Sequence, residues 1–214
     1  MVNIINLTKM SLNNLSSVIK SIGLVFCIWI IISIFSPSFL SMLFCMGSYL
    51  IVYQTMAYED MHGIDNLIST LPVKRSEYVI SRYVLGIFGA IISMILLLGV
   101  YFSISKVNKT DVSLELLIIT GVLSSVLVIS VIIPVVLKFG VTKGKIINFL
   151  VVFLLIGVGT GIIQEASSDK EFMDTVINII SSLGFPIVTS ILSLFMITIS
   201  MIISLKLYKS KEIK

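Results

Sequence analysis

Apolar residues continue for about the length of a membrane-crossing helix at six places in the chain. A helix needs roughly 20 mostly apolar residues to cross about 30 Å of hydrocarbon. The pattern predicts six spans: Ile22–Ser36, Phe39–Ala57, Tyr83–Ile104, Leu116–Leu137, Ile146–Ile163 and Leu183–Leu205. We therefore predict an all-α integral membrane protein with one transmembrane domain, residues 1–214.

A shorter amphipathic pattern precedes the first span, over residues 1–20. Apolar side chains recur at helical spacing: Ile4, Leu7, Leu12, Leu15, Val18 and Ile19. Polar side chains occupy much of the remaining circumference. This pattern predicts a helix that lies in the cytoplasmic interface of the membrane. The alternative is a tail that does not dock.

A polar segment, residues 59–77, separates the second and third spans. Its apolar residues follow one another at steps of three and four: Met61, Ile64, Leu67, Ile68 and Leu71. The spacing predicts a short helix, with Asp60 as its cap, Pro72 as its end and Ser76 as the cap of the next helix. Such a helix either passes a partner's movement into two spans or seals the loop onto lipid headgroups, and spacing alone favours neither.

Residues 164–182 form a second long connection, between spans five and six. Its second half alternates apolar residues with Asp174 and Asn178. We predict a short helix in the outer leaflet that is placed to act as a gate. A helix that simply rests on lipid is the alternative.

Composition supports the membrane assignment. The chain of 214 residues is 57% hydrophobic and only 12% charged, whereas soluble domains are about 25% charged. A soluble enzyme, a disordered chain and a nucleic-acid-binding domain are therefore excluded.

Basic residues are distributed unevenly over the predicted loops. With both termini inside, twelve of the 15 Lys and Arg residues and five of the 11 acids lie on the inner side. The inner side then carries a net charge of +7 and the outer side −3. Because basic residues concentrate in cytoplasmic loops, this bias predicts that both termini are cytoplasmic.

Catalytic chemistry is missing from the sequence. No charged residue lies in the middle of a predicted span, which argues against ion-coupled transport. The glycine-rich runs lack the spacing of a nucleotide-binding loop, and Cys27 and Cys45 lie in apolar runs without the spacing of a metal site. We predict a protein that is not an enzyme and binds neither metal nor cofactor.

One face of span two is a candidate substrate pathway. It carries small, polar and polarisable side chains: Ser41, Met42, Cys45, Ser48 and Tyr49. Ordinary helix packing explains the same stripe equally well.

The segment after span two resembles the hallmark of small type-2 ATP-binding-cassette (ABC-2) permeases. The matching residues are Glu59-Asp60, Asp65-Asn66-Leu67, Leu71-Pro72-Val73, Arg75, Glu77, Val79 and Ser81-Arg82-Tyr83. Six spans, an N-terminal interfacial helix and an extended outer segment also fit that family. The layout is similar to permeases of bacteriocin and phenol-soluble-modulin exporters.

The resemblance implies a permease subunit of an exporter in the bacterial cell membrane, moving amphipathic peptides or other apolar compounds. Two permease copies, identical or sister chains, would assemble in lipid with two cytoplasmic ATPase subunits, which would bind ATP and Mg. The helix between spans two and three would be the coupling helix, seated on the ATPase by Glu59, Asp60, Ile64, Asp65, Asn66, Leu67, Ile68 and Leu71. A membrane immunity or sensory subunit that binds a peptide without moving it is the alternative.

Overall fold

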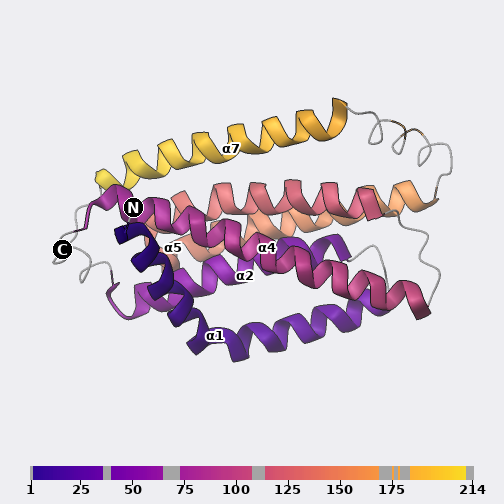
Figure 1. Cartoon of the computed structure of the whole chain (residues 1–214), viewed down its shortest axis with the longest axis horizontal. Helices are drawn as coiled ribbons and strands as arrows, with labels where there is room; N and C mark the ends of the chain where they lie inside the picture. Colours follow the sequence, from indigo (N-terminus) through magenta and orange to yellow (C-terminus); the bar gives the residue numbers. More distant parts are fainter. Residues whose placement is uncertain are drawn as a thin grey trace.

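The computed structural model describes residues 2–35, 40–64, 73–107, 114–168, 175, 178 and 184–210, and these are helical apart from short turns. The long helices are α1 (Val2–Phe35), α2 (Leu40–Met61), α4 (Arg75–Val107), α5 (Leu114–Ser168) and α7 (Gly184–Lys209). They run roughly along one axis (Figure 1). The prediction of an all-helical fold is confirmed for this part of the chain.

The described residues of each predicted span fall within a helix, and α5 contains two of the spans. Its backbone breaks at Gly140, where φ is 73° and ψ is 172°. A positive φ is easy only for glycine, so Gly140 marks the reversal between the predicted spans Leu116–Leu137 and Ile146–Ile163. Figure 1 shows the two halves of α5 lying side by side.

Helix α1 also has two parts. Asn3–Lys20 and Ile22–Ile34 meet at an angle of 62°, at the boundary that the sequence predicts between the N-terminal helix and the first span. The N-terminal part packs against α2 and α4. That it lies in a membrane interface stays a prediction.

Three described helices are long and apolar enough to cross a membrane: Arg75–Ser105, Leu117–Val141 and Ile187–Lys209. The bent pair in α1 makes a fourth if it counts as one span. Large hydrophobic side chains are exposed along α4, the second half of α5 and α7, as a lipid-facing surface requires. The topology of six spans remains a prediction.

Helix α2 lies at the centre of the bundle and packs mainly against α5 and α4. The main cluster of buried residues includes Val52 and Met56 of α2, Val79 of α4, and Ile132 and Ile133 of α5. Close approach helps this packing: a Cβ on Gly47 of α2 would lie 2.8 Å from the ring of Phe26 in α1. Van der Waals contact of this kind holds helices together where lipid offers no hydrophobic drive.

A chain of hydroxyl groups ties α7 to α5 and α4. Pro134 has no N–H to donate to the carbonyl of Ser130, four residues earlier. The Ser200 hydroxyl of α7 donates to that carbonyl instead, at 2.6 Å. The Tyr83 hydroxyl lies 2.6 Å from Ser200 Oγ and 2.8 Å from Ser204 Oγ. Since Ser200 has already given its proton to the carbonyl, Tyr83 donates to Ser200 and accepts from Ser204.

Replacing Ser200 by Ala should therefore destabilise the fold only while Pro134 is present. Ser200→Ala leaves the Ser130 carbonyl without a donor, at a cost of about 1–2 kcal/mol in the free energy of unfolding. In a Pro134→Ala background the new backbone N–H can bond this carbonyl, so Ser200→Ala should cost much less. Denaturant titration of the four proteins in detergent measures both costs, and equal costs in the two backgrounds would contradict the assignment.

Candidate functional site

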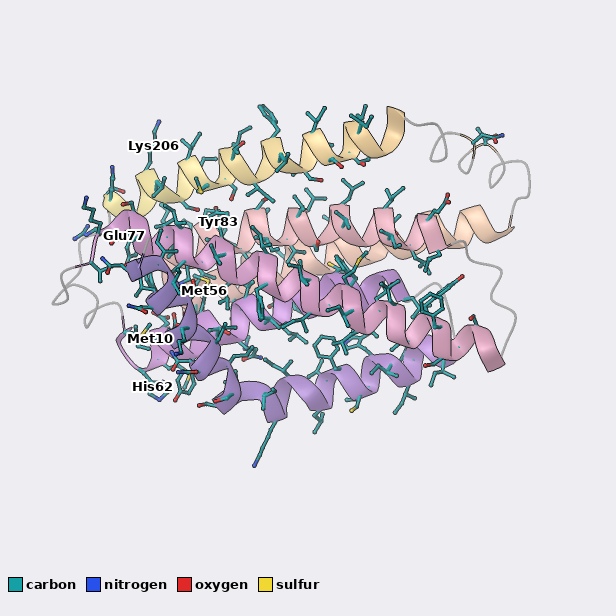
Figure 2. The ribbon with its side chains drawn as sticks, viewed as in Figure 1. Met10, Met56, His62, Glu77, Tyr83 and Lys206 are labelled. Atoms are coloured by element: carbon teal, nitrogen blue, oxygen red, sulfur yellow. The ribbon has the colours of Figure 1, made fainter. Side chains whose placement is uncertain are left out.

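Charged and polar side chains gather at one end of the bundle, where the N-terminal part of α1, the end of α2, the start of α4 and the end of α7 meet. Figure 2 shows Met10, His62, Glu77 and Lys206 of these four elements at that end. The break of α5 at Gly140 also lies there, since Gly140 faces Asp60. The segment that separates α2 from α4 thus begins and ends at this polar end.

A buried ion pair joins the two helices that flank this segment. Arg82 Nη2 of α4 lies 2.7 Å from Glu59 Oε2 of α2, and the two side chains are 0% and 2% exposed. The guanidinium also lies over the Tyr78 ring, 4.2 Å from its centroid. Buried charges are stable only when they are paired, so this pair fixes the end of α2 against the start of α4.

The N-terminal helix completes the coordination of this ion pair. The Ser11 hydroxyl is buried, accepts from Arg82 Nη1 at 2.7 Å and donates to Glu59 Oε1 at 2.9 Å. The Asn14 amide donates to the same carboxylate oxygen at 3.4 Å. One glutamate therefore connects three helices.

The next residue, Asp60, connects α2 to a fourth helix, α5. The Asp60 carboxylate accepts the backbone N–H of Val141 at 3.0 Å, so it caps the helix that begins after Gly140. An acidic cap is favourable because the first N–H groups of a helix lack partners within the helix. A Cβ on Gly140 would lie 3.5 Å from Asp60 Oδ2, so the contact is close.

The start of α4 is anchored in the same way. Glu77 accepts the backbone N–H of Lys74 and the amide of Asn3, each at 3.1 Å. Arg75 donates to the carbonyl oxygen of Lys209 in α7 at 3.2 Å. These contacts add α7 to the helices held at this end.

Two predictions for the ends of the coupling segment are wrong. Asp60 and Met61 belong to α2, which ends at Met61, and Gly63 then takes a positive φ of 64°. The prediction that Asp60 caps the short helix is therefore wrong, because a left-handed glycine breaks the backbone after both residues. The prediction that Ser76 caps the following helix is also wrong, since α4 begins at Arg75.

The predicted coupling residues are found in different places. Glu59 faces the interior of the bundle, Asp60 is exposed, and Ile64 packs against the main buried cluster. The remaining five lie outside the described residues: Asp65, Asn66, Leu67, Ile68 and Leu71. Contact of the segment with an ATPase stays a prediction.

The predicted pathway stripe lies on α2. Cys45 and Ser48 are buried, and the Ser48 hydroxyl donates to the carbonyl of Phe44 in its own helix at 2.9 Å. The Tyr49 ring stacks on Tyr53, with centroids 5.2 Å apart. The side chains of Ser41 and Met42 lie outside the described part. A role of the stripe in transport remains a prediction.

Two apolar grooves lie elsewhere, along the helices α4, α5 and α7. One, of about 470 Å³, runs between Ile118–Leu123 of α5 and Thr189–Leu194 of α7. The other, of about 350 Å³, is lined mainly by α4 and α5, including Ile91 and Val126, and also by Ile197 of α7. Both include Val122, so they adjoin.

Sequence reasoning missed Ser11, Asn14 and Arg82 as partners of Glu59. The pairing did leave a signal, because an acid close behind span two and an arginine just before span three are both adjacent to apolar runs. Charges at such positions need a partner once helices pack. Ser11 could not be found this way, since it interrupts the predicted apolar face of the N-terminal helix.

The fold and its exposed apolar helices define a multi-pass helical membrane protein. A family model described as ABC-2 family transporter protein matches residues 9–209. The chain therefore belongs to the ABC-2 transporter family, and it is the membrane component of an ABC transporter, which works with a partner ABC ATPase and is not itself catalytic. No curated protein and no solved structure shows a significant match to it.

Removing one member of the Glu59–Arg82 pair should cost about 3–5 kcal/mol in the free energy of unfolding, because the other charge is left buried alone. We expect this for Glu59→Gln and for Arg82→Met. The double variant Glu59→Gln/Arg82→Met should be more stable than the sum of the two single losses predicts, since no charge stays uncompensated.

Unfolding by denaturant in detergent measures these values, with Glu115→Gln as a control at an exposed acid of α5. Strictly additive losses in the double variant would show that the two side chains do not stabilise one another.

Proposed function

We propose that this chain is the permease subunit of an ATP-driven exporter that moves amphipathic peptides or other apolar compounds out of a bacterial cell. A separate cytoplasmic ATPase drives the movement through the segment from Glu59 to Leu71. The observation that carries this proposal is the position of the two helices that flank this segment, α2 and α4, which are held together at the polar end of the bundle by Glu59 and Arg82.

The charge distribution supports the orientation. The basic residues of the described helix ends lie at the end of the bundle that holds this segment, among them Lys74, Arg75, Lys206 and Lys209. Basic residues favour the cytoplasmic side. We therefore place this end and both termini in the cytoplasm, with six spans in the cell membrane.

Membership of the ABC-2 family supports a partnership with an ABC ATPase, and we propose the following assembly. Two permease copies, identical or sister chains, surround the pathway in lipid, and two ATPase subunits bind below them with ATP and Mg.

The grooves support an apolar or amphipathic cargo. Their walls are mainly apolar, and Thr189, Ser190 and Ser193 of α7 also line the larger groove. A pathway of this kind suits a molecule that has one apolar face and one polar face. It does not suit a small ion, which requires charged or carbonyl ligands.

The test is reconstitution of the permease and its ATPase in lipid vesicles with a fluorescently labelled amphipathic helical peptide. We expect the ATPase to co-purify and the peptide to cross the membrane only with ATP. Asp65→Ala and Leu67→Ala should lower transport per ATP hydrolysed while membrane insertion is unchanged, with Ser103→Ala, an exposed serine of α4, as the control.

Two results would contradict the proposal. Transport of the peptide without any ATPase would contradict the claim that a separate ATPase drives the movement. Peptide binding without ATP-dependent accumulation would favour the immunity or sensory subunit instead.

A further inference from the structure

We infer that Glu59 and Asp60 are positioning residues that carry the movement of the coupling segment into α1, α4 and the second half of α5. This inference rests on the proposed function and changes the role of both acids. Glu59 holds the inner end of α2 to its neighbours and does not touch the ATPase. We call the residues that these two acids contact, together with the acids themselves, the α2 hub: Ser11, Asn14, Glu59, Asp60, Arg82 and Val141.

The burial of Glu59 is the first reason to assign it a positioning role. Its side chain is 2% exposed and contacts Ser11 and Asn14 of α1 and Arg82 of α4. An ATPase seated on the polar end cannot reach a carboxylate that is already enclosed by α1 and α4. Glu59 therefore acts through its neighbours.

Direction is the second reason. Glu59 and Asp60 are consecutive, so their side chains leave α2 on different sides, about 100° apart around the helix. Glu59 points to Ser11 and Arg82, whereas Asp60 points to the N–H of Val141. Two adjacent residues thus connect α2 to three other elements.

Position in the chain is the third reason. The α2 hub stands directly before the turn at His62 and Gly63, where the coupling segment begins. Arg82 stands close behind the point where α4 leaves that segment. A push on the segment is therefore delivered to two helices that share an ion pair, and the contacts of Ser11 and Val141 extend it to the N-terminal helix and to α5.

Rigidity is what these contacts add. Arg82 Nε, Arg82 Nη2 and Glu59 Oε2 make no hydrogen bond among the described residues, so Nη2 and Oε2 are held by the attraction between the two charges at 2.7 Å. Separating a buried ion pair leaves each charge uncompensated and is strongly destabilising. The α2 hub should therefore move as one body.

The test uses the permease with its ATPase in lipid vesicles. Spin labels are placed at Ser16→Cys of α1 and Lys145→Cys of α5, both exposed, in a background of Cys27→Ser and Cys45→Ala. Distances between the labels are recorded without nucleotide and with trapped ATP. In the parent we expect one narrow distance distribution that is the same in both states.

Two variants leave both charges of the ion pair in place. Ser11→Ala removes the hydroxyl that bonds Arg82 and Glu59, and Asp60→Ala removes the contact with the N–H of Val141. We expect both to retain the ATPase as the parent does, to broaden the label distribution, and to lower transport of the labelled amphipathic peptide per ATP by roughly 2- to 30-fold, the range for residues that couple two sites. Ser103→Ala is the control and should match the parent.

The contrary results are distinct from one another. Variants that keep the narrow distribution and the parent's transport ratio would overturn the inference alone. Variants that lose the ATPase would make these residues docking contacts and would also overturn it. A parent that binds no ATPase would overturn the proposed function and this inference with it. A parent that binds the ATPase but does not move the peptide would overturn the proposed cargo. The distances between the labels would still test whether the α2 hub moves as one body.

Discussion

The buried contact between Glu59 and Arg82 is the constraint on which this end of the molecule depends. Two charges leave water at the ends of α2 and α4, and each is stable there only because the other is 2.7 Å away. The N-terminal helix is held by the same contact, since the Ser11 hydroxyl bonds both partners. This ion pair thus fixes the end of α2 relative to the start of α4. The coupling segment connects these two helix ends.

A second, neutral network holds α7. Pro134 removes one backbone donor in α5, and the Ser200 hydroxyl donates to the Ser130 carbonyl in its place. Tyr83 bonds Ser200, and Ser204 bonds Tyr83. In hydrocarbon a carbonyl without a donor is costly, so an interrupted helix needs a partner from a neighbour. The two networks use the consecutive residues Arg82 and Tyr83 of α4. Helix α4 thus links the coupling segment to the apolar groove that it lines with α5.

The helices could be predicted from sequence because a long apolar run permits little else. The break at Gly140 and the bend near Lys20 also fall where polar residues interrupt these runs. The polar contacts could not be predicted, because Glu59 and Asp60 have the same charge and adjacent positions yet face different helices. The direction of each side chain depends on where α2 ends. The predicted span ends at Ala57, whereas α2 continues to Met61 and ends before the left-handed Gly63. The family was predictable because its hallmark residues include Glu59 and Arg82 themselves.

The most direct measurement is a structure of the permease bound to its ATPase in two states, without nucleotide and with ATP trapped. The account predicts that Glu59 stays in contact with Arg82 and Ser11 in both states while the ends of α2 and α4 shift together with the ATPase. A structure in which Glu59 turns outward to bind the ATPase, or in which the ion pair opens between the two states, would contradict the central claim.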